Sequence, residues 1–511
     1  MQVYDNQVLL LNLREPARVT SVIPKSTTLD DNRVAVRWGL DEVRTLRNMD
    51  IKAPSPIEGR YEWTGSYAPF DHQKKTASFM TLNRRSFCFN EQGTGKTASA
   101  IWAADYLLNE GVINRVLIIC PLSIMDSAWR ADLFTFAMHR SVDIAHGAKE
   151  KRKKIIEGDA EFVIINYDGV EIVKDAVANG GFDLIIVDEA THYKNAQTKR
   201  WKTLNKLLKP DTWLWMMTGT PAAQSPLDAY GLAKLVNPNS VPKFFGTFRD
   251  QVMVKITQFK WIPKENATDI VFTALQPAIR FTKDECLDLP PMVYTKREVE
   301  LTQQQKKYYK ELKSKLIMRA AGEEITAANA AVAMNKLLQI SSGAVYTDTG
   351  EALEFDIKHR YKVLREVINE SSKKILVFVP FKHVIDVLTD KLNNDGIPAE
   401  YIRGDVSANK RTDIFNRFQT QEEPKVLVIQ PQAAAHGVTL TAANTVVWWG
   451  PTSSLETYAQ ANARVHRSGQ DQKCTVVQLQ GSYVEKRVYS LLDNRIDVHT
   501  KMIDLYNEML D

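Results

Sequence analysis

The sequence predicts an α/β protein with two parallel sheets, a helical insertion between them and a C-terminal helix. Short apolar runs recur in two series, which is typical of buried parallel strands joined by crossover helices. The first series is VLIIC (116–120), FVII (162–165), LIIV (184–187) and WLWMM (213–217); the second is KILVFV (374–379), AEYI (399–402), KVLVIQ (425–430), TVVWW (445–449) and TVVQL (475–479). Between the two series the pattern is helical, without a comparable rhythm of strands.

The length of 511 residues also predicts more than one domain. The Pro-rich stretch KAPSPIEGRYEWTG indicates a linker after a small first region. We therefore expect an N-terminal region whose role the sequence does not reveal (1–60), a first sheet domain (61–240), a helical insertion (241–355), a second sheet domain (356–482) and a C-terminal helix (483–511).

The composition is that of a soluble globular protein, with 44% hydrophobic and 25% charged residues. No N-terminal signal pattern is present, and the apolar runs are too short to span a membrane. We therefore expect a cytoplasmic protein without a membrane partner, in a bacterium or in the host cell if the sequence is viral. The four cysteines are isolated, which predicts neither a zinc site nor a disulfide framework.

The net charge of +5 is weak evidence for a polyanionic partner, but the charge is uneven. Residues 190–210 carry six basic residues and no acidic one, and residues 303–319 carry six against Glu311 alone. Each run taken alone is more typical of a solvated helix face than of a binding surface.

A loop of the phosphate-binding kind follows the apolar run SFCF. The stretch FNEQGTGKTA (89–98) fits the end of the pattern G-x-x-x-x-G-K-[ST], although Asn90 stands where the first glycine is expected. A helical pattern follows, so that backbone N–H groups and the helix dipole would bind an anion. The residues expected at the nucleotide are Gly93, Thr94, Gly95, Lys96 and Thr97. Lys96 would reach the outer phosphates and Thr97 would ligate Mg²⁺; the alternative is a glycine-rich turn with a solvated lysine.

A pair of carboxylates ends the predicted strand LIIV. Asp188 can hold Mg²⁺ and Glu189 can deprotonate an attacking water, which are the roles that a nucleoside triphosphatase needs. The loop TGTP (218–221) ends the next strand. Because ligands bind at the carboxyl ends of parallel strands, we expect these loops to meet the phosphate loop at one edge.

Two further groups of residues suit ATP hydrolysis. Upstream of the loop, the Gln73 amide can both donate to and accept from an adenine edge, which favours ATP over GTP. In the second half, QANARVHRSGQ places Arg464 and Arg467 on one helix face, where they can stabilise the charge on a transferred phosphoryl group. A surface arginine pair is the alternative.

Together these motifs resemble a known family. Gln73, NEQGTGKT, CPLSIMDSAW, DEATHYKN, TGTP, GVTLT and QANARVHRSGQ occur in the order of the motifs of superfamily two helicases. Their detail is similar to the Swi/Snf-type ATPases, in the minimal form found in bacteria and bacteriophages, over residues 65–490. The resemblance implies two RecA-like lobes, ATP and Mg²⁺ as cofactors, and double-stranded DNA, including branched or forked DNA, as partner.

The resemblance also implies roles for individual residues. Lys96, Asp188, Glu189, Arg464 and Arg467 would be catalytic, with the arginines acting in cis so that no oligomer is required. Gly437, in GVTLT, would contact the nucleotide. The implied DNA contacts are Ser123, Asn166 and Lys194 in the first lobe and Arg403, Gly404 and Thr441 in the second.

The sequence departs from the family pattern at several positions. Thr191 stands where a DEAH box has histidine, with His192 next, and PTSS replaces the usual Trp-Asn-Pro before the arginine helix. Three functions therefore stay open: a translocase on duplex DNA, a strand-separating DNA or RNA helicase, and an ATP-switched clamp on nucleic acid.

Overall fold

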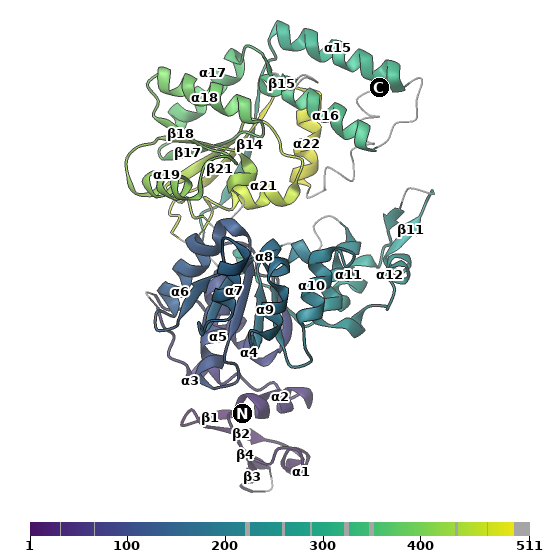
Figure 1. The fold of residues 1–511 in the computed structure, drawn as a ribbon, viewed down its shortest axis with the longest axis vertical. Helices are drawn as coiled ribbons and strands as arrows, with labels where there is room; N and C mark the ends of the chain where they lie inside the picture. Colours follow the sequence, from purple (N-terminus) through teal and green to yellow (C-terminus); the bar gives the residue numbers. More distant parts are fainter. Residues whose placement is uncertain are drawn as a thin grey trace. The chain divides into compact units, whose positions relative to one another are not determined.

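The computed structural model describes residues 1–30, 32–65, 67–219, 225–257, 261–286, 289–320, 327–346, 352–434, 438–467 and 469–494. The chain divides into two compact units, Met1–Cys286 and Leu287–Asp511 (Figure 1). No helix in these described ranges is long and apolar enough to cross a membrane.

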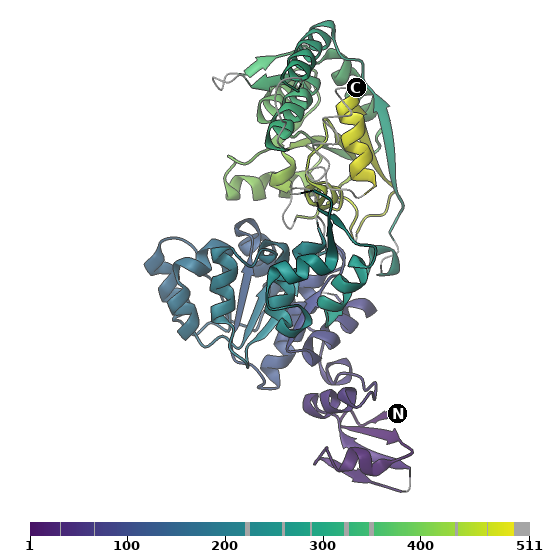
Figure 2. The ribbon, with the colours of Figure 1, turned by 90° about the vertical axis from the view of Figure 1, so that its right-hand side faces the viewer.

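The first unit begins with a small antiparallel sheet of order β1-β2-β4-β3 (Figure 2). Its elements are β1 (Gln2–Tyr4), β2 (Val8–Asn12), α1 (Pro16–Thr20), β3 (Ser26–Thr28), β4 (Arg33–Arg37), α2 (Leu40–Asn48) and α3 (Ile57–Arg60). Alternate residues of β2 and β4, such as Leu9, Leu11, Val34 and Val36, are buried because one face of the sheet belongs to a core that also contains residues of α1 and α2. Their core is continuous with that of the following sheet.

The main sheet of the first unit is parallel, with order β13-β5-β10-β9-β6-β8-β7. Its strands are β5 (Arg85–Cys88), β6 (Val116–Cys120), β7 (Val142–Ile144), β8 (Phe162–Asn166), β9 (Leu184–Val187), β10 (Trp213–Met217) and β13 (Ala278–Ile279). The four strands of the first predicted series are all present. They read as unbroken apolar runs because Val116 and Ile118 pack on one face of the sheet while Leu117 and Ile119 pack on the other.

Helices cover both faces of this sheet. The helical elements are α4 (Asp71–Leu82), α5 (Lys96–Asn109), η1 (Leu122–Ile124), the π-helix η2 (Met125–Arg130), α6 (Ala131–Phe136), α7 (Lys149–Ile156), α8 (Tyr167–Ile172), α9 (Lys174–Asn179), η3 (Ala190–Tyr193), α10 (Lys199–Leu207), η4 (Pro226–Asp228), α11 (Ala229–Val236), η5 (Pro238–Ser240), α12 (Phe245–Val252), α13 (Ala267–Ala274) and α14 (Lys283–Cys286). A two-stranded hairpin, β11 (Met253–Lys255) and β12 (Trp261–Pro263), follows α12.

The second unit contains a parallel sheet of order β14-β21-β20-β17-β19-β18. Its strands are β14 (Met292–Glu298), β17 (Lys374–Phe378), β18 (Ala399–Ile402), β19 (Val426–Ile429), β20 (Ala443–Trp448) and β21 (Cys474–Gln480). The other elements are α15 (Gln303–Ala320), α16 (Ala327–Ser342), the hairpin β15 (Ala344–Tyr346) and β16 (Ala352–Glu354), α17 (Lys358–Glu370), α18 (Lys382–Asn394), α19 (Ala408–Thr420), α20 (Pro431–Ala434), α21 (Leu455–Asn462) and α22 (Tyr483–Asp493). The predicted α/β class with two parallel sheets is confirmed.

The segment predicted as a helical insertion, 241–355, also supplies strands. β13 joins the first sheet and β14 joins the second. β14 is an edge strand whose residues alternate between partly and fully exposed, so it lacks the continuous apolar run that marks a central strand. The five domain boundaries stay predictions.

The predicted C-terminal helix begins as α22, at a capping box in which Ser482 and Glu485 bond reciprocally. Glu485 is fully buried and pairs with Arg360 of α17 at 2.8 Å, so a buried ion pair fixes this helix beside the second sheet. Residues 495–511 lie outside the described residues.

Candidate active site

The phosphate loop lies between the carboxyl end of β5 and the first residue of α5. Gly93 and Gly95 adopt positive φ angles of 86° and 79°, which L-residues with side chains rarely adopt. A Cβ at Gly95 would also lie 2.0 Å from Nε2 of Gln73. The glycines are therefore required by backbone conformation and by close packing, which supports a specific loop over a generic flexible turn.

Lys96 is the first residue of α5, so its backbone N–H is one of the unpaired donors at a helix N-terminus. Its Nζ donates to the carbonyl oxygens of Asn90 at 2.8 Å and Glu91 at 3.1 Å. The ammonium group is thus folded over the loop. Thr97, next in α5, is half-buried.

Asn90, the departure from the loop pattern, holds the loop to its surroundings. Its side chain is buried, donates to Oγ1 of Thr76 at 2.8 Å and accepts from the N–H of Phe281 at 3.0 Å. A glycine could make neither bond. No local sequence pattern indicates this role, because the partners lie 14 and 191 residues away.

Gln73 lies on α4 and is buried under the loop. Its Nε2 donates to the carbonyl of Thr94 at 3.3 Å, and its Oε1 accepts from the N–H of Phe70 at 2.9 Å. The neighbouring His72, which the sequence reading did not select, contacts the same Thr94 carbonyl through Nε2 at 2.8 Å. Both side chains therefore support the loop, and recognition of adenine by Gln73 stays a prediction.

Asp188 directly follows β9 and is held by two donors. Nε1 of Trp129 donates to its Oδ2 at 2.9 Å, and the N–H of Glu189 donates to its Oδ1 at 3.0 Å. Burial raises the pKa of Asp188, while Trp129 and the nearby charge of Lys96 act against that rise. Trp129 is the tryptophan of the CPLSIMDSAW motif, to which the sequence reading gave no role of its own.

Glu189 adopts the left-handed conformation, with φ 48° and ψ 57°. A non-glycine residue there is uncommon and is often found at functional sites. The hydroxyl of the buried Tyr167 donates to the backbone carbonyl of Asp188 at 2.6 Å, so the turn is fixed on its inner side.

The structure brings the phosphate loop and the carboxylate pair together. Strands β5, β10 and β9 are adjacent and parallel, so the loop, Thr218 and Asp188 follow the same edge of the sheet. Lys96 and Asp188 interact electrostatically, and both influence the pKa of the buried Cys88 thiol, which burial raises to about 11. The expected convergence at one edge is therefore present for the described residues; residues 220–224 lie outside them.

Arg464 and Arg467 both lie beyond α21, which ends at Asn462, so the prediction that they share one helix face is wrong. The chain leaves the helix before it reaches them, and the two side chains differ in their surroundings. Arg464 is 2% exposed, and its Nη1 donates to the Val438 carbonyl at 3.4 Å. Arg467 is half-buried and donates to the Ala463 carbonyl at 3.2 Å and to Oγ1 of Thr439 at 3.1 Å. Gly437 lies outside the described residues.

The predicted DNA contacts of the first unit follow carboxyl ends of strands. Ser123 lies in η1 after β6, and its buried Oγ has no hydrogen-bond partner within the described ranges. Asn166 ends β8, and its Oδ1 accepts from Arg152 at 2.8 Å. Lys194 follows η3 and pairs with Asp228 at 3.3 Å. These side chains share the sheet edge of the ATP site, and their role in DNA binding stays a prediction.

The three predicted DNA contacts of the second unit do not lie at the same edge of its sheet. Arg403 and Gly404 follow the carboxyl end of β18, where Arg403 pairs with Asp386 and Asp405. Thr441 precedes β20 and accepts from Gln419, near the end of α19, at 3.0 Å. Because β18 and β20 run in the same direction in one sheet, Thr441 lies at the opposite edge.

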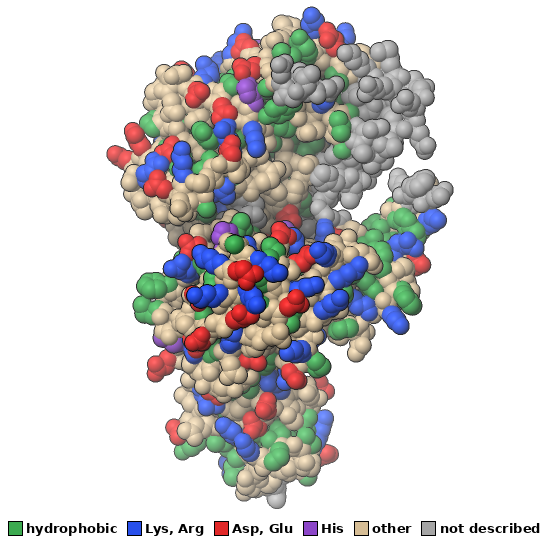
Figure 3. All heavy atoms as spheres, in the orientation of Figure 1, with side chains coloured by type: hydrophobic (Ala, Val, Ile, Leu, Met, Phe, Trp, Pro, Cys, Tyr) green, Lys and Arg blue, Asp and Glu red, His purple; other side chains and the backbone are tan. Residues whose placement is uncertain are grey.

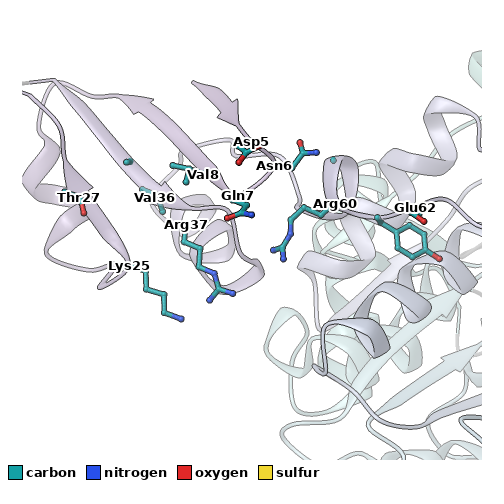
Figure 4. Close-up of a pocket in the computed structure, with 13 residues that line it drawn as sticks. Asp5, Asn6, Gln7, Val8, Lys25, Thr27, Val36, Arg37, Arg60 and Glu62 are labelled. Carbon is teal, nitrogen blue, oxygen red and sulfur yellow. The ribbon is translucent and has the colours of Figure 1, made fainter.

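A cavity of about 850 Å³ lies away from these residues, between the small N-terminal sheet and the segment that follows α3 (Figure 4). Its lining contains Lys25, Arg37 and Arg60 but also Asp5 and Glu62. This mixed charge does not define one class of ligand. Within the described ranges, no group of three or more His, Cys, Asp or Glu side chains is placed to hold a metal ion.

Two matches to family models identify the class of protein. Residues 72–345 match the SNF2-related domain, and residues 359–469 match the helicase conserved C-terminal domain. These matches place the chain among the helicase-type ATPases. Because the first match covers more than half of its length, the chain belongs to the SNF2-related family.

Similar proteins include an uncharacterized ATP-dependent helicase of Mycoplasma pneumoniae, 26% identical over 81% of this chain and 40% of that protein. SWI/SNF-related matrix-associated actin-dependent regulator of chromatin subfamily A-like protein 1 of Drosophila melanogaster is 24% identical over 85% of this chain and 55% of that protein. The chain thus spans about half the length of these curated relatives. A solved structure, the SWI2/SNF2 ATPase core of Sulfolobus solfataricus in complex with dsDNA, is 22% identical with a TM-score of 0.43, and the alignment covers 84% of this chain and 92% of that one.

Proposed function

We propose that the protein hydrolyses ATP and couples hydrolysis to movement along double-stranded DNA. The observation that carries this proposal is the meeting of Lys96, at the N-terminus of α5, with the Asp188–Glu189 pair at one edge of a parallel sheet. That set supplies a phosphate-binding cation, a metal ligand and a base, as phosphoryl transfer to water requires. Membership of the SNF2-related family supports it further.

Each residue of the first unit has a distinct task in this proposal. The backbone from Gly93 to Thr97 would cradle the phosphates, and Lys96 would exchange the Asn90 and Glu91 carbonyls for phosphate oxygens. Glu189 would accept the proton of the attacking water, and Gln73 would contact the adenine.

The residues present are suited to Mg²⁺. Burial raises the pKa of the Asp188 carboxyl, which disfavours its charged form, and a bound cation would stabilise that charged form. Thr97 and Asp188 would hold the ion, which would neutralise phosphate charge.

The second unit would supply the remaining charges in cis. Arg464 and Arg467 would act on the phosphates, with Gly437 near the nucleotide, so that no oligomer is required. Contacts to DNA would come from Ser123, Asn166, Lys194, Arg403, Gly404 and Thr441. Changes in the grip of the two units during each ATP cycle would then produce movement. We place this activity in the cytoplasm, in a minimal motor like those of bacteria and bacteriophages, acting on duplexes that include branched or forked DNA, where it would remodel forks or anneal strands.

The first experiment measures the ATPase rate of the purified chain with duplex DNA, single-stranded DNA or RNA in turn. We expect strong stimulation by duplex DNA, because a partner bound by both units favours the hydrolytic conformation. Binding should weaken steeply with salt and depend little on base sequence. Stimulation by RNA or by single strands alone would favour a strand-separating helicase instead.

The second experiment separates movement from clamping. The wild-type protein should displace the third strand of a DNA triplex in the presence of ATP, whereas Arg467→Ala should bind DNA and lose about 10³-fold or more of the stimulated rate. Duplex-stimulated hydrolysis without displacement of the third strand would reject the translocase and favour an ATP-switched clamp.

A further inference from the structure

A surface of the first unit, outside the ATP site, combines exposed aromatic, apolar and basic side chains. It is formed by Lys243 and Phe244, by α12, which follows them, and by the hairpin β11–β12. We call it the α12–hairpin surface. Its exposed apolar side chains are Phe244 (67%), Phe245 (41%), Val254 (40%), Ile256 (53%) and Ile262 (42%). Figure 3 shows hydrophobic and basic side chains side by side over α12 and β11. Soluble proteins seldom expose such a concentration of large apolar side chains unless it contacts a partner.

The backbone under this surface is well supported. Phe248 and Val252 of α12 are buried, and the ring of Phe248 lies 5.5 Å from that of Tyr230. The hairpin begins at the buried Met253 and is tied to α12 by a bond from Lys264 N to Val252 O of 2.9 Å. The exposed side chains are therefore presented by an ordered scaffold, which lowers the entropy cost of binding.

Cations alternate with the aromatic rings. The Arg249 guanidinium lies 4.1 Å from the centroid of Trp261, and the Lys255 ammonium lies 6.0 Å from the same ring. Phe245 and Arg249 are four residues apart on α12 and so share a face of the helix. Arg249 and Lys255 thus lie at one ring, that of Trp261, and Phe245 lies on the same helix face as Arg249.

The charge of the segment indicates a polyanionic partner. The described residues of this segment, 243–257 and 261–264, contain four basic residues against one acidic residue, Asp250. Proteins that bind single-stranded nucleic acid combine such a basic track with aromatic rings on which bases stack. A fully paired duplex offers its phosphates but hides its base faces, so it would leave the exposed rings without a partner.

We propose that the α12–hairpin surface binds an unpaired nucleic-acid strand, with bases against Phe244 and the neighbouring rings and phosphates near Lys243 and Lys255. The inference rests on the proposed function only in assigning nucleic acid as the partner. It adds a second contact on the first unit, which gives the protein a preference for duplexes that carry a single-stranded segment.

The test measures equilibrium binding of a fluorescent oligothymidylate to the full chain. Phe244→Ala should weaken binding about 5-fold or more, since stacking of one base on an aromatic ring is worth about 1–3 kcal/mol. Phe134→Ala is the matched control, because Phe134 on α6 is equally exposed, at 70%, and lies outside this surface. Replacing both Lys243 and Lys255 by Gln should reduce the slope of log affinity against log salt by about 1.4, since each phosphate contact on a single strand contributes about 0.7.

The outcomes separate this inference from the proposed function. The proposal for the α12–hairpin surface is rejected if Phe244→Ala and wild type bind the oligonucleotide with equal affinity, or if the wild type does not bind it. The proposed motor function would still stand in that case if duplex DNA stimulates ATP hydrolysis. Oligonucleotide binding that depends on Phe244 but not on Phe134 supports the proposed role of the α12–hairpin surface. If duplex DNA does not change the ATPase rate of the same protein, the proposed motor function is rejected. An acidic protein as the true partner would appear as the absence of oligonucleotide binding.

Discussion

The predicted catalytic residues of the two units are held in different ways. In the first unit, Lys96 and Asp188 already interact, and Asp188 is buried and bonded to Trp129. In the second unit, Arg464 is buried among bonds within its own unit, and only Arg467 is partly exposed. The first unit therefore presents a preorganised site, whereas the second presents one accessible arginine and one that is integrated in its fold.

The difference in burial between Arg464 and Arg467 means that residues of one motif need not share one role. Arg464 and Arg467 lie three positions apart and were predicted to act as a pair. Their burial suggests that loss of Arg464 disturbs the fold and that loss of Arg467 disturbs chemistry. The following experiments test that contrast, beginning with the largest expected effect.

Lys96→Ala should abolish ATP hydrolysis without unfolding the protein. The substitution removes the charge expected to contact the outer phosphates, while its present partners are two loop carbonyls that water can also bind. ATPase rate and thermal melting of the purified variant check both statements. Near-wild-type turnover would place the ATP site elsewhere.

Glu189→Gln should still bind ATP, because Asp188 and Lys96 remain. It should hydrolyse ATP at least about 10²-fold more slowly than the wild type, because the base is lost. Equilibrium binding of labelled ATP and single-turnover hydrolysis would measure the two effects separately. Loss of ATP binding would show that Glu189 shapes the site rather than serving as the base.

Arg464→Ala should lower the free energy of unfolding by about 2–3 kcal/mol, because it removes a buried side chain that donates to the Val438 carbonyl. Arg467→Ala should lower it by less than about 1 kcal/mol, since that side chain is partly in water. Denaturant unfolding of both variants makes the comparison. Equal losses of stability would remove the distinction between the two arginines.

Asn90→Gly restores the glycine of the usual loop pattern, yet it should destabilise the first unit by about 1–3 kcal/mol. It deletes the bonds to Thr76 and Phe281 and leaves their polar groups unpaired. Chemical unfolding of the variant, compared with the wild type, measures the loss. A neutral or stabilising Asn90→Gly would mean that the residue is an incidental departure from the pattern.

The smallest effect concerns His192, beside the carboxylate pair. Desolvation by the groups around the ring, reinforced by the charge of Arg200, lowers the pKa of His192 below its ordinary value, although the residue as a whole is exposed at the surface like His146. The unfolded chain therefore takes up a proton more readily, so stability is complete above about pH 6.5 and falls as the pH drops toward the lowered pKa. His192→Gln should flatten the loss of stability between about pH 7 and pH 5, and His146→Gln, at an exposed position, should not. An unchanged slope in His192→Gln would contradict this origin.

The class of fold and the segments that meet at the candidate site were predictable from the amino-acid sequence. Unbroken apolar runs at 116–120 and 426–429 identify buried parallel strands because both of their faces are covered. The loop and the carboxylate pair are legible because each is a contiguous stretch whose chemistry depends on local backbone. Edge strand β14 was not legible, since pairing on one side leaves a weak apolar signal.

Only the tertiary structure shows which side chains hold the residues of the candidate site in place through hydrogen bonds. Trp129 reaches Asp188 across 59 residues, and Asn90 reaches Phe281 across 191 residues, distances over which no local pattern carries information. The same holds for Arg464 and Arg467, which lie three residues apart beyond the end of α21. Their spacing does not indicate that they differ in exposure, yet Arg464 is 2% exposed and Arg467 is half-buried. Burial depends on contacts from distant segments, so only the folded chain could show this difference between the two arginines.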